Sequence, residues 1–431
     1  MDELSSIFTN LLVSGESHGK QHSIEGLAYA TLQPAIKEKL AHDPAALKSL
    51  IKALADAPPK SPITYGALSV LANLTRYLPT LSDEEQKMAQ LKAYANAAGK
   101  LSSQLDTLSD NAHVAERCKL VFEAGVTPVL VTHSKNGSPA SLGLCIAIIF
   151  SLSTTQSMRG QLAQQGAVKL LLTSWTALPE SEAAARRVAA QALARILIST
   201  NPTLVFGGSH SHSQSSAIRP LVSILPPDPA AEKRDLLPTF EALMALTNLA
   251  STEDDDSRRT IIRTAWPQIE EQLLSSNNLV TKAAVELVCN LMQAPEGVAL
   301  YADGSPQAKQ RLHILLALAD AEDQGTRSAA GGALASLTGF EEVVRALLQR
   351  ERGVDVALGL CADADEGLRH RGAVVVYNVV SAEGEAGALG RKKVREAKGL
   401  EVLKECAKRS RRHEVVEVTL QALKALLEDA S

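Results

Sequence analysis

Hydrophobic and polar positions along this chain form a short block that returns at a nearly constant interval. The block is apolar except at its fourth position, and four copies lie in the second half of the sequence: Ala245–Ala250, Leu287–Met292, Ala333–Thr338 and Val375–Val380. Their fourth positions are Asn248, Asn290, Ser336 and Asn378, so the steps are 42, 46 and 42 residues. Around the first block, Leu243, Leu246 and Leu249 recur at helical spacing, which predicts a helix with one apolar face.

Weaker copies of the block extend the pattern toward both ends of the chain. Their fourth positions are Tyr29, Asn73, Ser151, Arg195 and Gln421. A period of this size, built from helices, is typical of armadillo and HEAT arrays. We therefore predict an all-α, armadillo/HEAT-like superhelical solenoid of about eight to ten repeats. Such arrays usually provide extended binding surfaces and not pockets for chemistry.

Each repeat is expected to contain a short first helix and two longer ones. Gly125 and Gly166 each precede an apolar run, which predicts a sharp turn in a backbone conformation that glycine tolerates. The long third helix is clearest at Pro238–Leu249, where the apolar stripe is continuous. These features favour the three-helix armadillo order within a repeat.

Two intervals are longer than the period. The first, of 78 residues, holds a lysine- and glutamine-rich stretch and predicts an insert or degenerate repeat near 80–111. The second, of 53 residues, holds a run rich in serine and histidine and predicts a surface loop at 203–216. We therefore divide the chain into leading repeats over 1–111 and a second armadillo-repeat domain over 112–431.

Composition and charge narrow the possible functions. The chain has 44 Lys and Arg against 48 Asp and Glu, and its net charge of −4 argues against a broad nucleic-acid surface. The five cysteines are scattered without zinc or redox spacing, as buried thiols in a reducing compartment would be. The apolar run Leu142–Phe150 is too short to span a bilayer, and the residues after Met1 lack a signal-peptide layout. We predict a cytoplasmic protein, and expect a domain cut from a longer chain because the repeats begin so early.

Candidate chemistry is sparse. His210 and His212 lie near one another without a local carboxylate or cysteine, so a solvated loop is favoured over a metal site. The acidic run 253–256 lacks calcium-loop spacing, and the chain has neither a GxxxxGK[ST] phosphate loop nor a Gly-x-Ser-x-Gly elbow. We predict no enzyme activity, no cofactor and no metal. The basic stretches 391–395 and 408–412 could meet an acidic partner or lipid headgroups, but a solvated helical face is favoured.

The recurring asparagine is the more informative feature. Asparagine is a mediocre helix former, so its periodic use within helices needs a reason. If the same helix of every repeat lines a concave side, the asparagines form a row whose amides could pair with the backbone of an extended peptide. Alternatively, each amide bonds a neighbouring helix or loop and holds repeat to repeat. The sequence leaves both roles open.

Longer motifs around these blocks resemble one known family. They are the segments 240–250, 327–335 and 370–378, then Gln191–Ala194, Asn201, Pro202, Phe206 and Ile218–Leu221 in the same order, and the leading repeat Ile24–Leu32 with Ile36–Glu38. On these residues the chain resembles the UCS family of myosin-directed chaperones, over most of its length.

The resemblance implies an armadillo-repeat protein that binds the myosin motor domain and helps it fold or stay folded. It implies no ATPase in this chain and cooperation with an ATP-driven general chaperone of ninety kilodaltons. The expected contact surfaces are a concave groove and the loop that follows Asn201 and Pro202. The groove residues would be Asn248, Asn290, Ser336, Asn378, Tyr377, Arg371 and Glu241, and the loop residues Phe206, His210, His212 and Arg219.

Two departures and one rival accompany the resemblance. Animal members carry an N-terminal tetratricopeptide domain that this sequence does not show, so we expect a fragment or a fungal-type member. The loop is rich in histidine and serine where the family usually has a bulkier charged stretch. The rival is a generic armadillo adaptor for extended peptides, a class with tryptophan beside the groove asparagine, whereas Trp175 and Trp266 lie outside the motif. The myosin class and head-to-tail self-association stay open.

Overall fold

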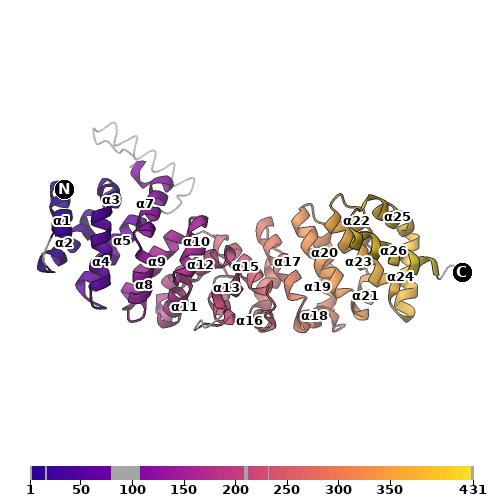
Figure 1. Cartoon of the computed structure of the whole chain (residues 1–431). Coiled ribbons are helices and arrows are strands. Elements are labelled where there is room, and N and C mark those ends of the chain that lie inside the picture. The colour runs from indigo at the N-terminus through magenta and orange to yellow at the C-terminus, as the bar shows by residue number, and fades with distance from the viewer. Residues whose placement is uncertain (1, 15–16, 79–106, 208–211, 232, 429–431) are drawn as a thin grey trace, which may run out of the picture. The chain divides into compact units, whose positions relative to one another are not determined.

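The computed structural model describes residues 2–14, 17–78, 107–207, 212–231 and 233–428. These residues form helices joined by turns and contain no β-strand, which confirms the all-α prediction. The chain divides into two compact units, Met1–Ile224 and Leu225–Ser431. Figure 1 shows that helices within each unit pack side by side.

The first unit is built from pairs and triplets of helices. They are α1 (Asp2–Ser14), α2 (Ser17–Ala30), α3 (Pro34–Ala41), α4 (Pro44–Asp56), α5 (Pro62–Thr75), η1 (Thr107–Ser109), α7 (Asn111–Glu123), α8 (Val126–Ser134), α9 (Pro139–Ser153), α10 (Gln156–Gln164), α11 (Ala167–Ala177), η2 (Glu180–Glu182), α12 (Ala183–Ile198), α13 (Pro202–Phe206), η3 (Gln214–Ala217) and α14 (Ile218–Val222). The triplets α3–α5, α7–α9 and α10–α12 each end in a long third helix, as the armadillo order predicts.

The second unit repeats the same plan. Its helices are α15 (Leu237–Ala250), α16 (Asp255–Gln272), α17 (Asn278–Leu291), α18 (Pro295–Ala302), α19 (Pro306–Ala319), α20 (Gln324–Leu337), α21 (Glu341–Leu348), α22 (Gly353–Cys361), α23 (Glu366–Ser381), α24 (Gly384–Glu396), α25 (Gly399–Arg409) and α26 (His413–Glu428). Triplets run over α18–α20, α21–α23 and α24–α26. Before them, the single long helix α16, which contains Pro267, precedes α17.

Short polar residues and glycines set where helices begin. The Asp43 carboxylate accepts the backbone amides of Ala45 and Ala46 at 3.0 Å, and such a cap satisfies donors that the first helical turn leaves unpaired. Gly125 and Gly166, before α8 and α11, have φ of +88° and +91°, which confirms the predicted turns.

The third helices form the core of each unit. In the second unit α15, α17, α20, α23 and α26 contact one another in that order, and in the first unit α2 contacts α5, α5 contacts α9 and α9 contacts α12. The apolar stripe read from the sequence is what they bury, since Leu246, Leu249 and Leu287 have no exposed surface. Burying one such side chain contributes roughly 1.5–3 kcal/mol, so stacking of apolar faces stabilises the array.

The structure changes the predicted loop at 203–216 and leaves the predicted boundary after residue 111 untested. The loop expected at 203–216 begins within α13 and ends within η3, so both of its ends are helical. Asn201 and Pro202 start α13, because the Asn201 side chain accepts the Thr203 amide at 2.9 Å. The insert expected near 80–111 lies largely outside the described residues, and the boundary after residue 111, at the start of α7, stays a prediction.

In the part of the chain that the structure describes, no helix has both the length and the apolar character needed to cross a membrane.

Candidate binding surface on the third helices

The asparagine row of the second unit joins neighbouring third helices. Asn290 of α17 donates from Nδ2 to the carbonyl oxygen of Thr247 on α15, at 3.1 Å. Asn378 of α23 donates from Nδ2 to the carbonyl oxygen of Ala335 on α20 at 3.2 Å and to Thr338 Oγ1 at 3.0 Å. These side-chain amides therefore bridge one repeat to the one before it.

The same bridge occurs in the first unit. Asn73 of α5 donates to the carbonyl oxygen of Ala28 on α2 and to Thr31 Oγ1, both at 3.1 Å. In all three bridges the accepting carbonyl lies one residue before the corresponding block position of the preceding repeat. Asn73, Asn290 and Asn378 therefore each join a third helix to the third helix of the preceding repeat. Asn248, on α15, is half-buried like the other asparagines of the row.

Ser336 breaks the row. It occupies the block position on α20, but its hydroxyl donates to the Gly332 carbonyl of its own helix at 3.3 Å. Its side chain is shorter than that of asparagine and is exposed to solvent. The junction between α17 and α20 therefore differs chemically from those on either side.

Arg371 lies close to two of these third helices. Its guanidinium donates to the Ser328 hydroxyl on α20. A Cβ at Gly332 would lie 3.5 Å from Arg371 Nε and 2.9 Å from Cys289 Sγ of α17, so glycine permits this close approach. Burial raises the pKa of the Cys289 thiol and the Arg371 charge opposes that rise. The site thus combines a cation with a neutral thiol.

Of the other predicted groove residues, one is buried and one is half-buried. Glu241 on α15 is only 8% exposed, and Tyr377 on α23 is half-buried. Nearby on α17, burial raises the pKa of the half-buried Glu286 carboxyl, and Lys282 opposes that rise. Polar groups on this face are therefore partly withdrawn from water, which strengthens their interactions with any charged group that binds.

The predicted loop residues lie on different elements, and their role stays a prediction. Phe206 ends α13 and is half-buried, His212 is half-buried, and His210 lies outside the described residues. Arg219 belongs to α14, where its guanidinium carbon lies 5.6 Å from the centre of the Trp175 ring. Among the residues that the structure describes, no group of three metal-ligating side chains occurs.

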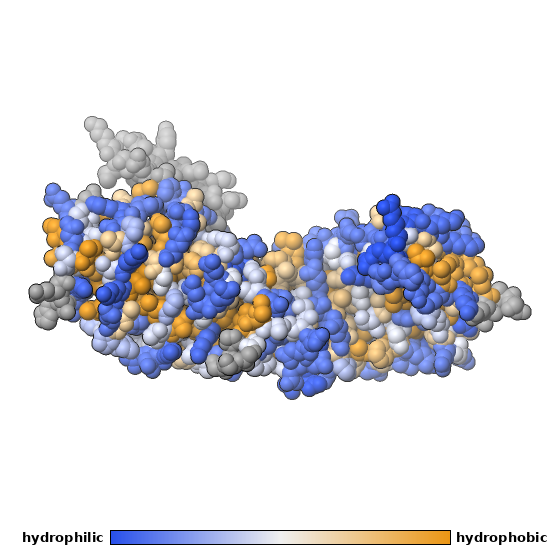
Figure 2. All heavy atoms as spheres, viewed as in Figure 1, coloured by the Kyte–Doolittle hydropathy of each residue, from blue (hydrophilic) through white to orange (hydrophobic). Residues whose placement is uncertain are grey.

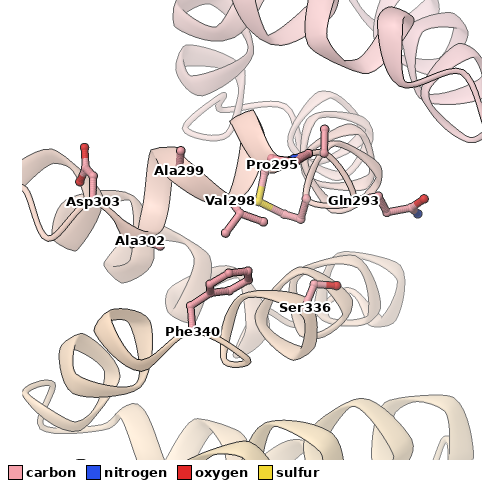
Figure 3. Close-up of a pocket in the computed structure, with 10 residues that line it drawn as sticks. Gln293, Pro295, Val298, Ala299, Ala302, Asp303, Ser336 and Phe340 are labelled. Carbon is pink, nitrogen blue, oxygen red and sulfur yellow. The ribbon is translucent and has the colours of Figure 1, made fainter.

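A pocket of about 640 Å³ opens beside Ser336. It is lined by Met292, Gln293, Ala294, Pro295, Val298, Ala299, Ala302, Asp303, Ser336 and Phe340. In Figure 3, Val298 and Ala302 of α18 face Phe340, with Gln293 and Ser336 at one end and Asp303 at the other. Of these residues, only Ser336 was predicted from the sequence as a site residue. The available signal was the serine in an asparagine position followed by a phenylalanine four residues later.

The C-terminal basic stretches serve two purposes. Arg391 donates to the Val380 carbonyl oxygen at 2.8 Å and Lys393 to the Leu348 carbonyl oxygen at 2.7 Å, so part of the first stretch joins helices. In the second stretch Arg411 and Arg412 are exposed. Figure 2 shows hydrophilic side chains gathered over the α22 and α25 region. The predicted solvated face therefore holds for the exposed members.

Two curated proteins are similar in sequence to most of this chain. No family model matches the chain. The chain is 30% identical over 361 residues to Ring assembly protein 3 of Schizosaccharomyces pombe, covering 83% of this chain and 47% of that protein. It is 26% identical to Protein unc-45 homolog B of Homo sapiens, covering 96% of this chain and 43% of that one. The chain thus spans less than half the length of these relatives.

Solved structures share the helical arrangement. UNC-45 from Drosophila melanogaster superposes with a TM-score of 0.81 at 27% identity, over 99% of this chain and 52% of that chain. A structure of an UNC-45 chaperone described in terms of binding and folding muscle myosin has a TM-score of 0.79 at 20% identity, over 98% of this chain and 43% of that chain. The second likeness supports the fold alone.

Proposed function

Because the chain belongs to the UCS family of myosin-directed chaperones, we propose that it binds the myosin motor domain and promotes its folding or stability without using ATP. The observation that carries the proposal is the third-helix surface of the second unit. There, half-buried polar groups run beside an open apolar pocket. Such a surface suits an extended, partly folded segment, which offers both backbone and apolar side chains.

The contacts with the client are assigned to groups other than the bridging amides. Asn290 and Asn378 use their amide hydrogens between repeats, so the proposed contacts are Arg371, Tyr377 and the residues of the pocket. The bridges keep neighbouring third helices in register and so preset the shape of the surface. A preset surface loses less conformational entropy when a client binds.

The proposed action needs binding and no chemistry. A chaperone that binds one state of the motor domain more tightly shifts the client toward that state. When the concentration of free chaperone is about 100 times its dissociation constant, binding stabilises that state of the motor domain by about 2.7 kcal/mol. We further propose that the protein is cytoplasmic and has neither enzyme activity nor a cofactor. Its second proposed partner is the ninety-kilodalton general chaperone.

The adaptor alternative finds no support in the two tryptophans. Trp175 and Trp266 are 7% and 5% exposed, so neither presents its ring to a peptide on the surface. Trp266 instead packs edge to face with Tyr301, at 6.1 Å between ring centres. Neither tryptophan can therefore form the exposed tryptophan and asparagine pair by which peptide adaptors bind extended peptides.

Direct binding tests the proposal. Purified myosin motor domain is immobilised, either native or after mild urea treatment, and the chain is passed over it without nucleotide. We expect saturable binding that is tighter to the urea-treated motor domain. An unrelated protein treated in the same way serves as the control for general stickiness. Equal binding to the control protein, or no binding to either motor sample by a chain of full helical content, would refute the proposal.

A further inference from the structure

The pocket beside Ser336 lies at a junction where two recurring contacts are replaced. The fourth residue of α10 is Arg159 and that of α16 is Arg258, and each arginine donates from Nε to a carbonyl at the end of the preceding third helix. The acceptors are the Ser153 oxygen, at 2.7 Å, and the Ala250 oxygen, at 3.0 Å. These side chains occupy the space between the end of a third helix and the next first helix.

In α18 the fourth residue is Val298, which lines the pocket. On the facing helix α20, Ser336 holds the position at which α5, α17 and α23 carry a bridging asparagine. A long side chain is thus exchanged for a shorter one at both positions. The pocket lies where Val298 and Ser336 take the positions of those longer side chains.

The pocket has an apolar wall and an acidic end. Val298, Ala302 and Phe340 face one another in Figure 3, and Phe340 is 46% exposed although it is fully apolar. Asp303 marks one end, and the Ser305 hydroxyl and backbone amide hold the pKa of its carboxyl below the ordinary value. Glu342 is close by, since a Cβ at Gly304 would lie 3.7 Å from its Oε2, and its Oε1 already lies 3.7 Å from Nη1 of Arg345.

We propose that this pocket receives a single apolar side chain from an extended polypeptide segment in which the next residues include a lysine or arginine. The apolar side chain packs between Val298, Ala302 and Phe340. The cation pairs with Asp303 at the acidic end, so charge complementarity selects the segment. Only the source of the segment, a non-native stretch of the motor domain, rests on the proposed function.

Two labelled peptides of glycine and serine probe the pocket. One contains phenylalanine followed by lysine, and the other has serine in place of the phenylalanine. Fluorescence anisotropy should show the phenylalanine peptide binding at least about tenfold more tightly, because a buried aromatic side chain supplies the main apolar contact. A third peptide with glutamate in place of lysine should also bind more weakly.

Refilling the pocket gives the matched variants. Val298→Arg places at this position the residue that α10 and α16 hold there, so the fold should accept it. Ser336→Asn introduces the residue that bridges repeats at Asn73, Asn290 and Asn378. Each variant should weaken binding of the phenylalanine peptide at least about tenfold. Leu279→Arg, at a 62% exposed apolar position outside the lining, is the control and should leave binding unchanged.

The outcomes separate this inference from the proposed function. The pocket inference is overturned if the phenylalanine and serine peptides bind equally well. It is also overturned if folded Val298→Arg and Ser336→Asn variants both bind the phenylalanine peptide as the original chain does. In either case, binding of the motor domain by the original chain still supports the proposed function. Selective peptide binding that Val298→Arg abolishes supports the pocket. If the original chain then fails to bind the motor domain, the proposed function alone is overturned.

Discussion

Replacing Asn378 by alanine should loosen the junction between α20 and α23 without unfolding the second unit. The substitution removes two hydrogen bonds, to the Ala335 carbonyl oxygen at 3.2 Å and to Thr338 Oγ1 at 3.0 Å. A hydrogen bond contributes roughly 0.5–1.5 kcal/mol net, so the two together should contribute about 1–3 kcal/mol. Because repeats are stabilised by their neighbours, the loss should fall on this junction and not on the whole chain.

Equilibrium urea unfolding, followed by circular dichroism, measures the free energy of unfolding, and hydrogen exchange of the α20 and α23 amides localises the loss. Asn378→Asp is the matched variant, because it keeps the side-chain size but presents an acceptor to the Ala335 carbonyl. It should destabilise at least as much as Asn378→Ala. If both variants keep the original stability and exchange while binding of the motor domain falls, the amide acts on the client and the bridging role is refuted.

Three further predictions concern backbone geometry and pH. Gly372→Ala should lower the free energy of unfolding by about 1–3 kcal/mol, because the added Cβ would lie 2.6 Å from the backbone nitrogen of Cys361. The loss should appear as a lower melting temperature. Lys398→Gly should stabilise by about 1 kcal/mol in urea unfolding, since Lys398 has φ of +59°. The Glu366 pKa is lowered from 4.5 because its carboxylate accepts the backbone amides of Arg412 and Arg411. This contribution is present above pH 4.5 and is lost as the pH falls through the lowered pKa. The protection factor of the Arg412 amide in hydrogen exchange, its slowing relative to an unstructured amide at the same pH, should therefore fall in acid, and Glu366→Gln should remove that pH dependence.

Much of the fold could be predicted because its causes are local or periodic. The apolar stripe around Leu246 and Leu249 fixes which helix face is buried, and repetition of that stripe fixes how helices stack. Gly125 and Gly166 mark turns because their positive φ is a local requirement. The exception is the stretch after Asn201, where a side-chain cap and a proline start a one-turn helix within a run that lacks helical periodicity.

The binding surface could be predicted only in part, because its chemistry depends on distances between repeats. The sequence placed Asn290 and Asn378 in a row, but the accepting carbonyls are 43 residues away along the chain. The pocket was not anticipated because it arises from side chains that are shorter than their counterparts. In the sequence Val298 is an ordinary apolar helix residue. Only the structure of α16 shows that a longer side chain, Arg258, can hold the same position.

The most direct test of the account is protection of the myosin motor domain from heat aggregation in the absence of nucleotide. Light scattering of the heated motor domain is recorded alone, with the chain and with the Val298→Arg variant at equal concentration. We expect the original chain to suppress scattering in proportion to its concentration and the variant to suppress it less. Scattering that the original, fully folded chain leaves unchanged would contradict this expectation.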